Sequence, residues 1–273
     1  MIQTISQEFQ NVWPIIALND FLRYAIAASV LASILFVFRH MLAQRRIQDR
    51  HAGWKDIRRE VTYSLLTILI FSLVGFGTYM GGLYGIFRLS MEMPTLWSGL
   101  FDFVVIVLAH DAYFYWIHRG MHHPRLYRRF HRLHHRSVTP TPWTAYSFAP
   151  LEAIVEAAFL PLIFLFLETS HFIAFAFTSH MIVRNVIGHA GVELFPKRWL
   201  QWPVLRLITT TTHHDLHHSE FRWNYGLYFT WWDRLMGTEH PHYEERFNAS
   251  VAREDAYPDG EVGIEPIASL PRP

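Results

Sequence analysis

Apolar residues gather in four long blocks along the first two thirds of the chain, with polar segments between them. The blocks span residues 21–38, 61–80, 100–117 and 151–187. Each block is long enough to supply the roughly 20 residues that a helix needs to cross the hydrocarbon core of a bilayer. The fourth is interrupted near Pro161 and again at residues 167–171, so the pattern predicts a helical hairpin that enters and returns to the same side.

Positive charges are distributed unevenly between these blocks. Residues 39–60 carry seven Lys and Arg, whereas residues 81–99 carry only Arg88. By the positive-inside rule, the first connection is cytoplasmic and the N-terminus lies outside. We therefore expect an all-α integral membrane protein with about four transmembrane helices: two spans, a third that leads into a polar segment, and the hairpin. Four buried helices of a soluble protein are the alternative, which the modest overall hydropathy leaves open.

Three regions follow from this pattern. Residues 1–95 hold the first transmembrane helices and the basic cytosolic loop. Residues 96–246 hold the segments whose residues are candidates for a functional site. Residues 247–273 are polar and rich in Pro and Gly without periodicity, so we expect a disordered C-terminal tail. The N-terminus lacks the basic region and cleavage site of a signal peptide, so we expect it to be kept in the mature protein.

Composition narrows the possible chemistry. The absence of cysteine excludes disulfides, thiolate metal sites, iron–sulfur clusters and a thiol nucleophile. A net charge of +1 gives no electrostatic argument for nucleic acid as a partner. The eighteen histidines are unusual, because Lys and Arg together number only 24.

The histidines form repeated motifs. The spacing H-x-x-H-H occurs twice, and its three positions fall on one face of a helix. One such triplet is expected roughly 0.08 times by chance in a chain of this composition. A single triplet fits a basic amphipathic helix on a membrane surface equally well, but two triplets and an i, i+4 pair indicate a metal site. The motif residues are His118 and His122 for the pair, and His131, His134, His135, His214, His217 and His218 for the triplets.

Neutral imidazole is a common ligand for late first-row metals, and one ion cannot use so many. With His189 and His213 the candidates number ten, which is enough for two ions with four or five ligands each. An all-nitrogen set suits Fe, Zn, Cu or Ni better than Mg or Ca. The sequence therefore predicts a dinuclear site in a cytosolic, helical, histidine-rich cap at the membrane boundary.

Five stretches carry a resemblance to a known family. In chain order they are HRGMHHPRLYRRFHRLHH, PTPWTAYSFAPLEA, NVIGHAGVE, HHDLHHSEFRWNYG and WWDRLMGT. Over residues 102–238 the chain resembles the sterol desaturase and fatty acid hydroxylase superfamily of membrane-bound di-iron enzymes. The resemblance implies that residues 96–246 form a catalytic region. It also implies a non-haem di-iron centre that activates O2 to hydroxylate or desaturate a lipid C–H bond.

The resemblance also assigns residues. It implies that all ten histidines named above are metal ligands, with His213 as a doubled start of the last motif. Asn185 stands where some members have a histidine, and its side chain would reach a metal directly or through water. Ala149 stands where a histidine often precedes Pro-Leu-Glu in the family, so the subfamily is not assigned.

Several other polar residues are candidates for roles near the site. His110 and Asp111 lie in an apolar segment, where ionisable groups are costly, so we expect a catalytic or network role, with a polar pair that closes the helix bundle as the alternative. Asp111 is about 10 Å along the helix axis from His118, too far for a direct hydrogen bond. Asp215 and Asp233 are candidates to hold the second ring nitrogen of a ligand histidine.

The chain shows no dinucleotide-binding fingerprint and no room for a fused haem or flavin domain. We therefore expect electrons from a separate donor of the ferredoxin or cytochrome b5 type with its reductase, and a location in a bacterial inner membrane. A transition-metal transporter is the alternative, but it would need ligands within the spans. A membrane metallohydrolase is not supported, because the sequence has no H-E-x-x-H motif. The sequence does not distinguish sterol-like from fatty acyl substrates, nor hydroxylation from desaturation.

Overall fold

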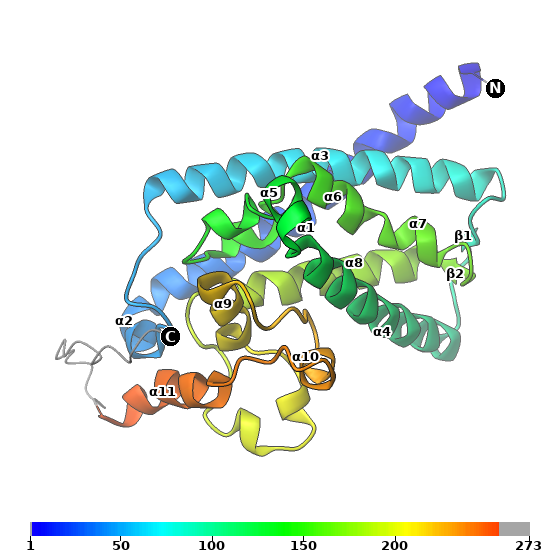
Figure 1. Cartoon of the computed structure of the whole chain (residues 1–273). Coiled ribbons are helices and arrows are strands. Elements are labelled where there is room, and N and C mark those ends of the chain that lie inside the picture. The colour runs from blue at the N-terminus through cyan, green and yellow to red at the C-terminus, as the bar shows by residue number, and fades with distance from the viewer. Residues whose placement is uncertain (1, 257–273) are drawn as a thin grey trace.

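The computed structural model describes residues 2–256 and is built on three long helices (Figure 1). These are α1 (Ile2–Val37), α3 (Trp54–Leu83) and α4 (Leu96–Met121). Each contains one of the first three apolar blocks, and each is long and apolar enough to cross a membrane. The prediction of a mainly helical chain is confirmed, and so are the length and apolar character of its first three expected spans.

The outer faces of these helices keep large apolar side chains exposed. Ile15 of α1 is 60% exposed, Leu69 of α3 is 44% exposed and Phe101 of α4 is 65% exposed. Extended apolar surfaces are rare on soluble monomers and mark contact with membranes or partner proteins. The three faces are therefore suited to contact with lipid.

The inner faces of α1 and α3 build one core with a short 3₁₀ helix, η3 (Pro142–Tyr146), and with α8 (His171–Gly188). Tyr24 of α1 is buried there, stacks on Tyr146 and donates a hydrogen bond of 2.9 Å to the carbonyl oxygen of Trp143. Ile182 of α8 belongs to the same cluster. This core fixes the segment after the second histidine motif against the membrane helices.

The fourth apolar block forms several short elements in place of one long span. It holds α6 (Pro150–Ala157), α7 (Phe159–Ile163), strand β2 (Thr169–Ser170) and α8. β2 pairs in parallel with β1 (Leu89–Ser90), and α8 then runs back across the molecule (Figure 1). The predicted interruptions coincide with α7 and β2. Among the described residues the candidate spans number three, so the expected fourth span stays a prediction.

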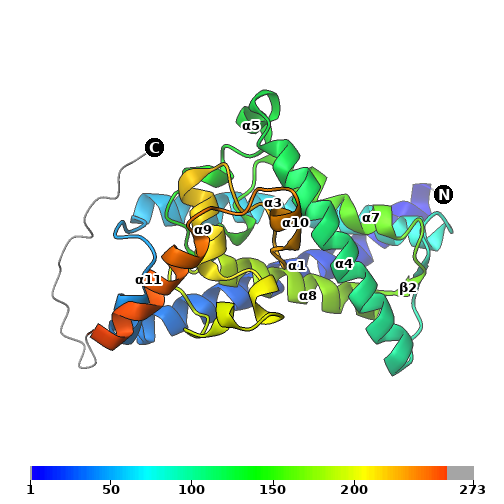
Figure 2. The ribbon, with the colours of Figure 1, turned by 60° about the horizontal axis from the view of Figure 1, so that its bottom comes forward.

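The remaining elements are short. α9 packs against α8 and α11, and α10 lies beside α4 (Figure 2). Their bounds are α5 (Pro124–Phe130), η2 (His134–Arg136), α9 (Thr211–Glu220), α10 (Trp231–Leu235) and α11 (Tyr243–Ala256), with α2 (Arg39–Leu42), η1 (Ala43–Arg45), η4 (Trp199–Gln201) and η5 (Leu205–Leu207) in the connections.

The first histidine triplet is not on a regular helix, so the prediction of a single helical face is wrong there. α5 ends at Phe130, and the chain continues through a turn into the 3₁₀ helix η2. Successive residues of a 3₁₀ helix point about 120° apart. The turn is held by tertiary contacts, because the hydroxyls of Ser137 and Thr141 donate to the buried carboxylate of Glu60 on α3 at 2.7 and 2.6 Å.

The expected disorder from residue 247 is wrong for residues 247–256, which complete α11. Tyr243, Phe247 and Val251 recur every four residues and are buried against Leu200 and Leu216. This stripe on one helical face is the signal that the polar composition concealed. Residues 257–273 of the expected tail lie outside the described residues.

Replacement of Phe247 by Ala tests this correction. Phe247 is fully buried, so its removal should lower the free energy of unfolding by about 3–5 kcal/mol, as is typical of buried Phe-to-Ala changes. Thermal unfolding in detergent should then show a clear fall in Tm. The matched control is Arg246→Ala on the exposed face of α11, which should leave Tm nearly unchanged. Equal Tm values for the two variants would contradict the buried position of Phe247.

Candidate metal centre

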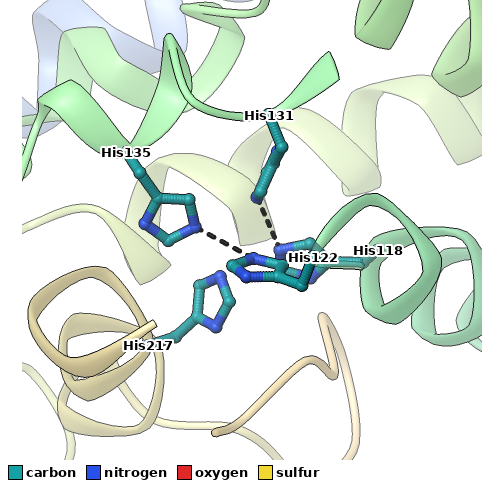
Figure 3. Close-up of side chains that lie close together, drawn as sticks. All are labelled: His118, His122, His131, His135 and His217. Atoms are coloured by element: carbon teal, nitrogen blue, oxygen red, sulfur yellow. Dashed lines mark hydrogen bonds between the residues drawn. The ribbon is translucent and has the colours of Figure 1, made fainter. Parts of the chain in front are cut away.

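The structure places nine of the ten candidate ligands in two histidine clusters. Within each cluster, one nitrogen from every histidine lies within 4.8 Å of the corresponding nitrogen of every other. The first cluster contains His118, His122, His131, His135 and His217, and the second contains His134, His189, His214 and His218. Figure 3 shows the five rings of the first cluster pointing toward one another from α4, from the loop around η2 and from α9.

Both triplets divide between the clusters. The loop around η2 gives two histidines to the first cluster and one, His134, to the second. α9 does the reverse, giving His217 to the first cluster and its other two ligands to the second. α9 is fixed at both ends: the hydroxyl of Thr210 caps its start, and Phe221 ends it with a left-handed φ of 63°. Because the loop around η2 and α9 each contribute histidines to both clusters, the two clusters lie next to each other.

Hydrogen bonds fix the tautomers in the first cluster. His118 Nδ1 donates to the carbonyl oxygen of Tyr225 at 2.8 Å, and His131 Nδ1 donates to Oε1 of Glu152 at 2.5 Å. A neutral imidazole carries one proton, so Nε2 of both rings presents a lone pair. These two Nε2 atoms are 2.9 Å apart (Figure 3). Two lone pairs at this distance repel each other unless a cation lies between them.

One further ring of the first cluster, that of His217, follows the same pattern. His217 Nδ1 donates to the carbonyl oxygen of Trp223 at 2.7 Å, and its buried Nε2 has no hydrogen-bond partner. His122 Nε2 and His135 Nε2 are 3.1 Å apart. The cluster thus presents imidazole nitrogens to a shared centre, and hydrogen bonds outside that centre leave the Nε2 atoms of His118, His131 and His217 without a proton.

The second cluster shows this most clearly at His189. Its Nδ1 donates to the carbonyl oxygen of Asn185 at 2.7 Å, so its Nε2 is bare. That single atom faces the Nε2 atoms of three other rings, those of His134, His214 and His218, at 3.3, 3.0 and 3.1 Å. One nitrogen cannot make three hydrogen bonds of this kind, whereas one metal ion satisfies all four.

The nitrogen–nitrogen distances fit metal ligation. Ligands bound at about 2.1 Å lie roughly 3.0 Å apart at right angles and roughly 3.4 Å apart in a tetrahedron. Burial also keeps the rings in the neutral form that binds metals. It lowers the pKa of His189 to about 4, and burial together with the neighbouring His218 lowers the pKa of His135 well below its usual range. Both clusters are therefore able to bind metal ions.

Two of the expected supporting residues act through the backbone around the clusters. The carboxylate of Asp233 accepts hydrogen bonds from the backbone N–H groups of Tyr225 and Gly226 at 2.8 and 2.9 Å. It thereby fixes the turn whose carbonyl orients His118. Asn185 orients His189 with its carbonyl oxygen, while its side-chain amide donates to the carbonyl oxygen of Ala145 at 2.7 Å and lines the small pocket beside the cluster histidines.

Other sequence candidates lie outside both clusters. His213 is fully buried, and its Nε2 is 3.6 Å from Oδ2 of Asp233. Asp215 accepts a hydrogen bond from Gln48 at 2.8 Å and belongs to neither cluster. Neither residue is placed to contact an ion in the clusters.

Asp111 and His110 also lie apart from the clusters. Asp111 accepts hydrogen bonds from the indole N–H of Trp231 at 2.6 Å and from the N–H groups of Tyr228 and Phe229 at 3.2 Å. It ties α4 to the first residue of α10 and to the segment before it. His110 is buried among aromatic rings such as Phe159 and lines an apolar cavity.

Glu152 contacts a cluster histidine, and the sequence patterns considered above did not single it out. It is fully buried and orients His131, as described above. A carboxylate inside the fourth apolar block is the same kind of signal that singled out Asp111 on α4. The carbonyl groups of Trp223 and Tyr225 had no such signal, because backbone atoms carry no residue identity.

An apolar cavity of about 430 Å³ adjoins the clusters. Its walls come from α1, α3, α4, α6, α7 and α8. Phe114, Phe148, Glu156 and Asn185 line this cavity and also the small pocket beside the cluster histidines. The volume falls within the range of roughly 300–1,000 Å³ typical of ligand sites. The cavity therefore offers an apolar molecule access to the clusters.

The structure places His214 in the second cluster and His213 outside both clusters, although they are neighbours in the chain. His214→Ala removes a nitrogen from the second cluster, so we expect the protein to lose the ion held there. His213→Ala removes no cluster nitrogen and should keep the full metal content, although its buried position makes some loss of stability expected. Elemental analysis of purified, iron-loaded variants measures this. Metal loss in folded His213→Ala, with full content in His214→Ala, would contradict the assignment.

Comparisons with known proteins agree with this geometry. A family described as fatty acid hydroxylase matches residues 103–238. Delta(7)-sterol 5(6)-desaturase ERG3B of Gibberella zeae is 32% identical over 219 residues, which are 79% of this chain and 64% of that protein. Lathosterol oxidase of Homo sapiens is 29% identical over 256 residues, which are 84% of this chain and 79% of that protein.

The chain thus spans less than two thirds of the Gibberella zeae relative and about four fifths of the human one. No solved structure matches it significantly. The family match covers the segment that contains all nine cluster histidines. The chain belongs to the sterol desaturase and fatty acid hydroxylase superfamily.

Proposed function

We propose that this protein is a membrane oxidoreductase that uses two iron ions and O2 to hydroxylate or desaturate a C–H bond of a lipid. The observation that carries the proposal is the pair of adjacent all-histidine clusters beside an apolar cavity. Two irons bound there would supply the activation of O2 and the removal of hydrogen from the substrate. Nitrogen donors suit iron, as they also suit Zn, Cu and Ni, and the family membership favours iron.

The chain's own residues hold the geometry and exclude water. Eight of the nine cluster histidines are buried, and His122 is partly exposed. Glu152 and the backbone carbonyls described above keep the protonated nitrogen of each oriented ring away from the centre. Fixed tautomers of this kind are what a ligand needs to bind its metal with one defined nitrogen.

The cavity supports an apolar substrate that enters from the bilayer. Side chains such as Ile16 of α1, Val74 of α3 and Met181 of α8 line it. The substrate would reach the clusters past Phe148 and Glu156, which the cavity shares with the histidine pocket. The relatives named as sterol desaturase and lathosterol oxidase favour a sterol-like lipid, and the family description keeps a fatty acyl chain as the other class. Both reactions begin by removal of one hydrogen.

The proposal includes an orientation and a partner. The basic segment 39–60 supports a cytoplasmic position for the connection between α1 and α3, with the N-terminus outside and the histidines on the cytoplasmic side of a bacterial inner membrane. Electrons would come from a separate ferredoxin or cytochrome b5 type donor with its reductase.

The alternative function is transport or storage of a transition metal. A transporter needs ligands along its spans, near the middle of the membrane. Here the cluster histidines begin at the C-terminal end of α4 and lie in the segments that follow it. His110, farther inside α4, contacts aromatic rings and belongs to neither cluster. A fixed catalytic centre therefore fits these positions better.

Replacement of His134 by Ala tests the proposal. It removes a nitrogen of the second cluster, so iron binding and lipid product should fall together to the level of cells without the protein. Mass spectrometry of lipids from cells with and without O2 measures the product. The matched control is the exposed His242→Ala, which should keep full activity. Product at the normal level in His134→Ala, or metal flux into vesicles without O2-dependent lipid oxidation, would refute the enzyme.

A further inference from the structure

A charged pair lies in the wall of the apolar cavity. Asp20 and Arg23 are on α1, inside the first candidate span, and their side chains are only 12% and 16% exposed. Charged groups at such positions are costly and are retained mainly where they contribute to function or pair with each other. Both residues lie outside the segment that the family match covers, residues 103–238. The family match therefore gives no reason for their presence.

The two side chains satisfy each other only in part. The Arg23 guanidinium donates to Asp20 Oδ1 and lies over the ring of Phe175 on α8, 5.1 Å from its centroid. Arg23 Nε is buried and has no hydrogen-bond partner. Among the described residues, the Asp20 carboxylate accepts its hydrogen bond from Arg23. A guanidinium has five N–H groups and a carboxylate has two oxygens, so this contact leaves further donors on Arg23 and an acceptor on Asp20 for a molecule in the cavity.

The pair lies away from the reactive end of the cavity. Asp20 and Arg23 line the cavity together with Asn19 and Thr178, but none of the four lines the small pocket beside the cluster histidines. Most of the remaining wall is apolar. A ligand that fills this space would be largely apolar, with one hydrogen-bonding group at the pair and a C–H bond near the clusters.

We propose that the Asp20–Arg23 pair recognises the hydroxyl group of an otherwise apolar lipid alcohol, the substrate of the reaction proposed above. A hydroxyl donates one hydrogen bond and accepts others, so it matches the carboxylate of Asp20 and the remaining N–H groups of the Arg23 guanidinium together. The pair is neutral overall, so a fatty acid carboxylate would gain no net attraction and would face the like charge of Asp20. The pair therefore selects an alcohol over a fatty acid. It also orients the substrate along the cavity, with the hydroxyl at the pair and a C–H bond near the clusters.

Equilibrium binding tests this inference. The probes are a fluorescent sterol alcohol with conjugated double bonds, its deoxy analogue without the hydroxyl, and a fluorescent fatty acid. Each is titrated into the full-length, metal-loaded protein in nanodiscs under argon, where no O2 is present for turnover. We expect the wild type to bind the alcohol about tenfold more tightly than the deoxy analogue, as one or two net hydrogen bonds allow.

Two cavity variants and one control localise the preference. Arg23→Met keeps most of the side-chain length, and Asp20→Asn keeps the volume and serves if the first variant does not fold. In both, the alcohol and its deoxy analogue should bind within about twofold of each other, with binding of the deoxy analogue unchanged. Arg39→Met is the control, because Arg39 lies beyond the end of α1, is exposed and does not line the cavity. It should keep the tenfold preference.

The inference is overturned if the wild type binds the alcohol and the deoxy analogue equally, if it prefers the fatty acid, or if the preference survives in both cavity variants. Absence of binding by any probe would also overturn it, because the cavity would then not be a lipid site. The assay does not depend on turnover. Hydroxyl-dependent binding without lipid oxidation would refute only the proposed reaction, and oxidation without a hydroxyl preference would refute only the role of the pair.

Discussion

The arrangement of the two histidine clusters is governed by the repulsion between imidazole lone pairs that face one another inside the protein. In the second cluster the bare Nε2 of His189 has three other nitrogens within 3.3 Å, and in the first cluster two bare nitrogens are 2.9 Å apart. Buried rings with lowered pKa values do not relieve this repulsion by taking up protons at neutral pH. Metal ions relieve it, so the folded state should be linked to metal binding and gain stability from it.

Buried carboxylates outside the clusters hold the segments that carry the ligands. Glu60 binds the loop after η2 to α3, Asp111 binds the segment before α10 to α4, and Asp233 fixes the turn that orients His118. Among the buried carboxylates of residues 2–256, Glu152 is the one that contacts a cluster ring directly. Buried carboxylates thus hold the segments that carry the histidines, while imidazoles alone point into the clusters. Both clusters therefore consist of nitrogen donors only.

Much of the site follows from the sequence because a metal site built from imidazoles requires many histidines at defined spacing. Nine of ten candidates lie in the clusters, and the first three spans follow from apolar length. Other features depend on tertiary contacts. The 3₁₀ turn at His134 is stabilised by hydrogen bonds to Glu60, far away in the chain. His213 differs from His214 only in the direction that α9 gives its side chain, and Phe247 is buried by partners that its polar neighbours do not reveal.

The central claim is that the two clusters hold two ions in different surroundings, one with five imidazoles and one with four. Mössbauer spectroscopy of the protein loaded with iron-57 under reducing conditions, together with the iron content per chain, tests this most directly. The account predicts two irons per chain and two distinct high-spin iron signals of equal area. One iron per chain with a single signal, or no iron retained after loading, would contradict it.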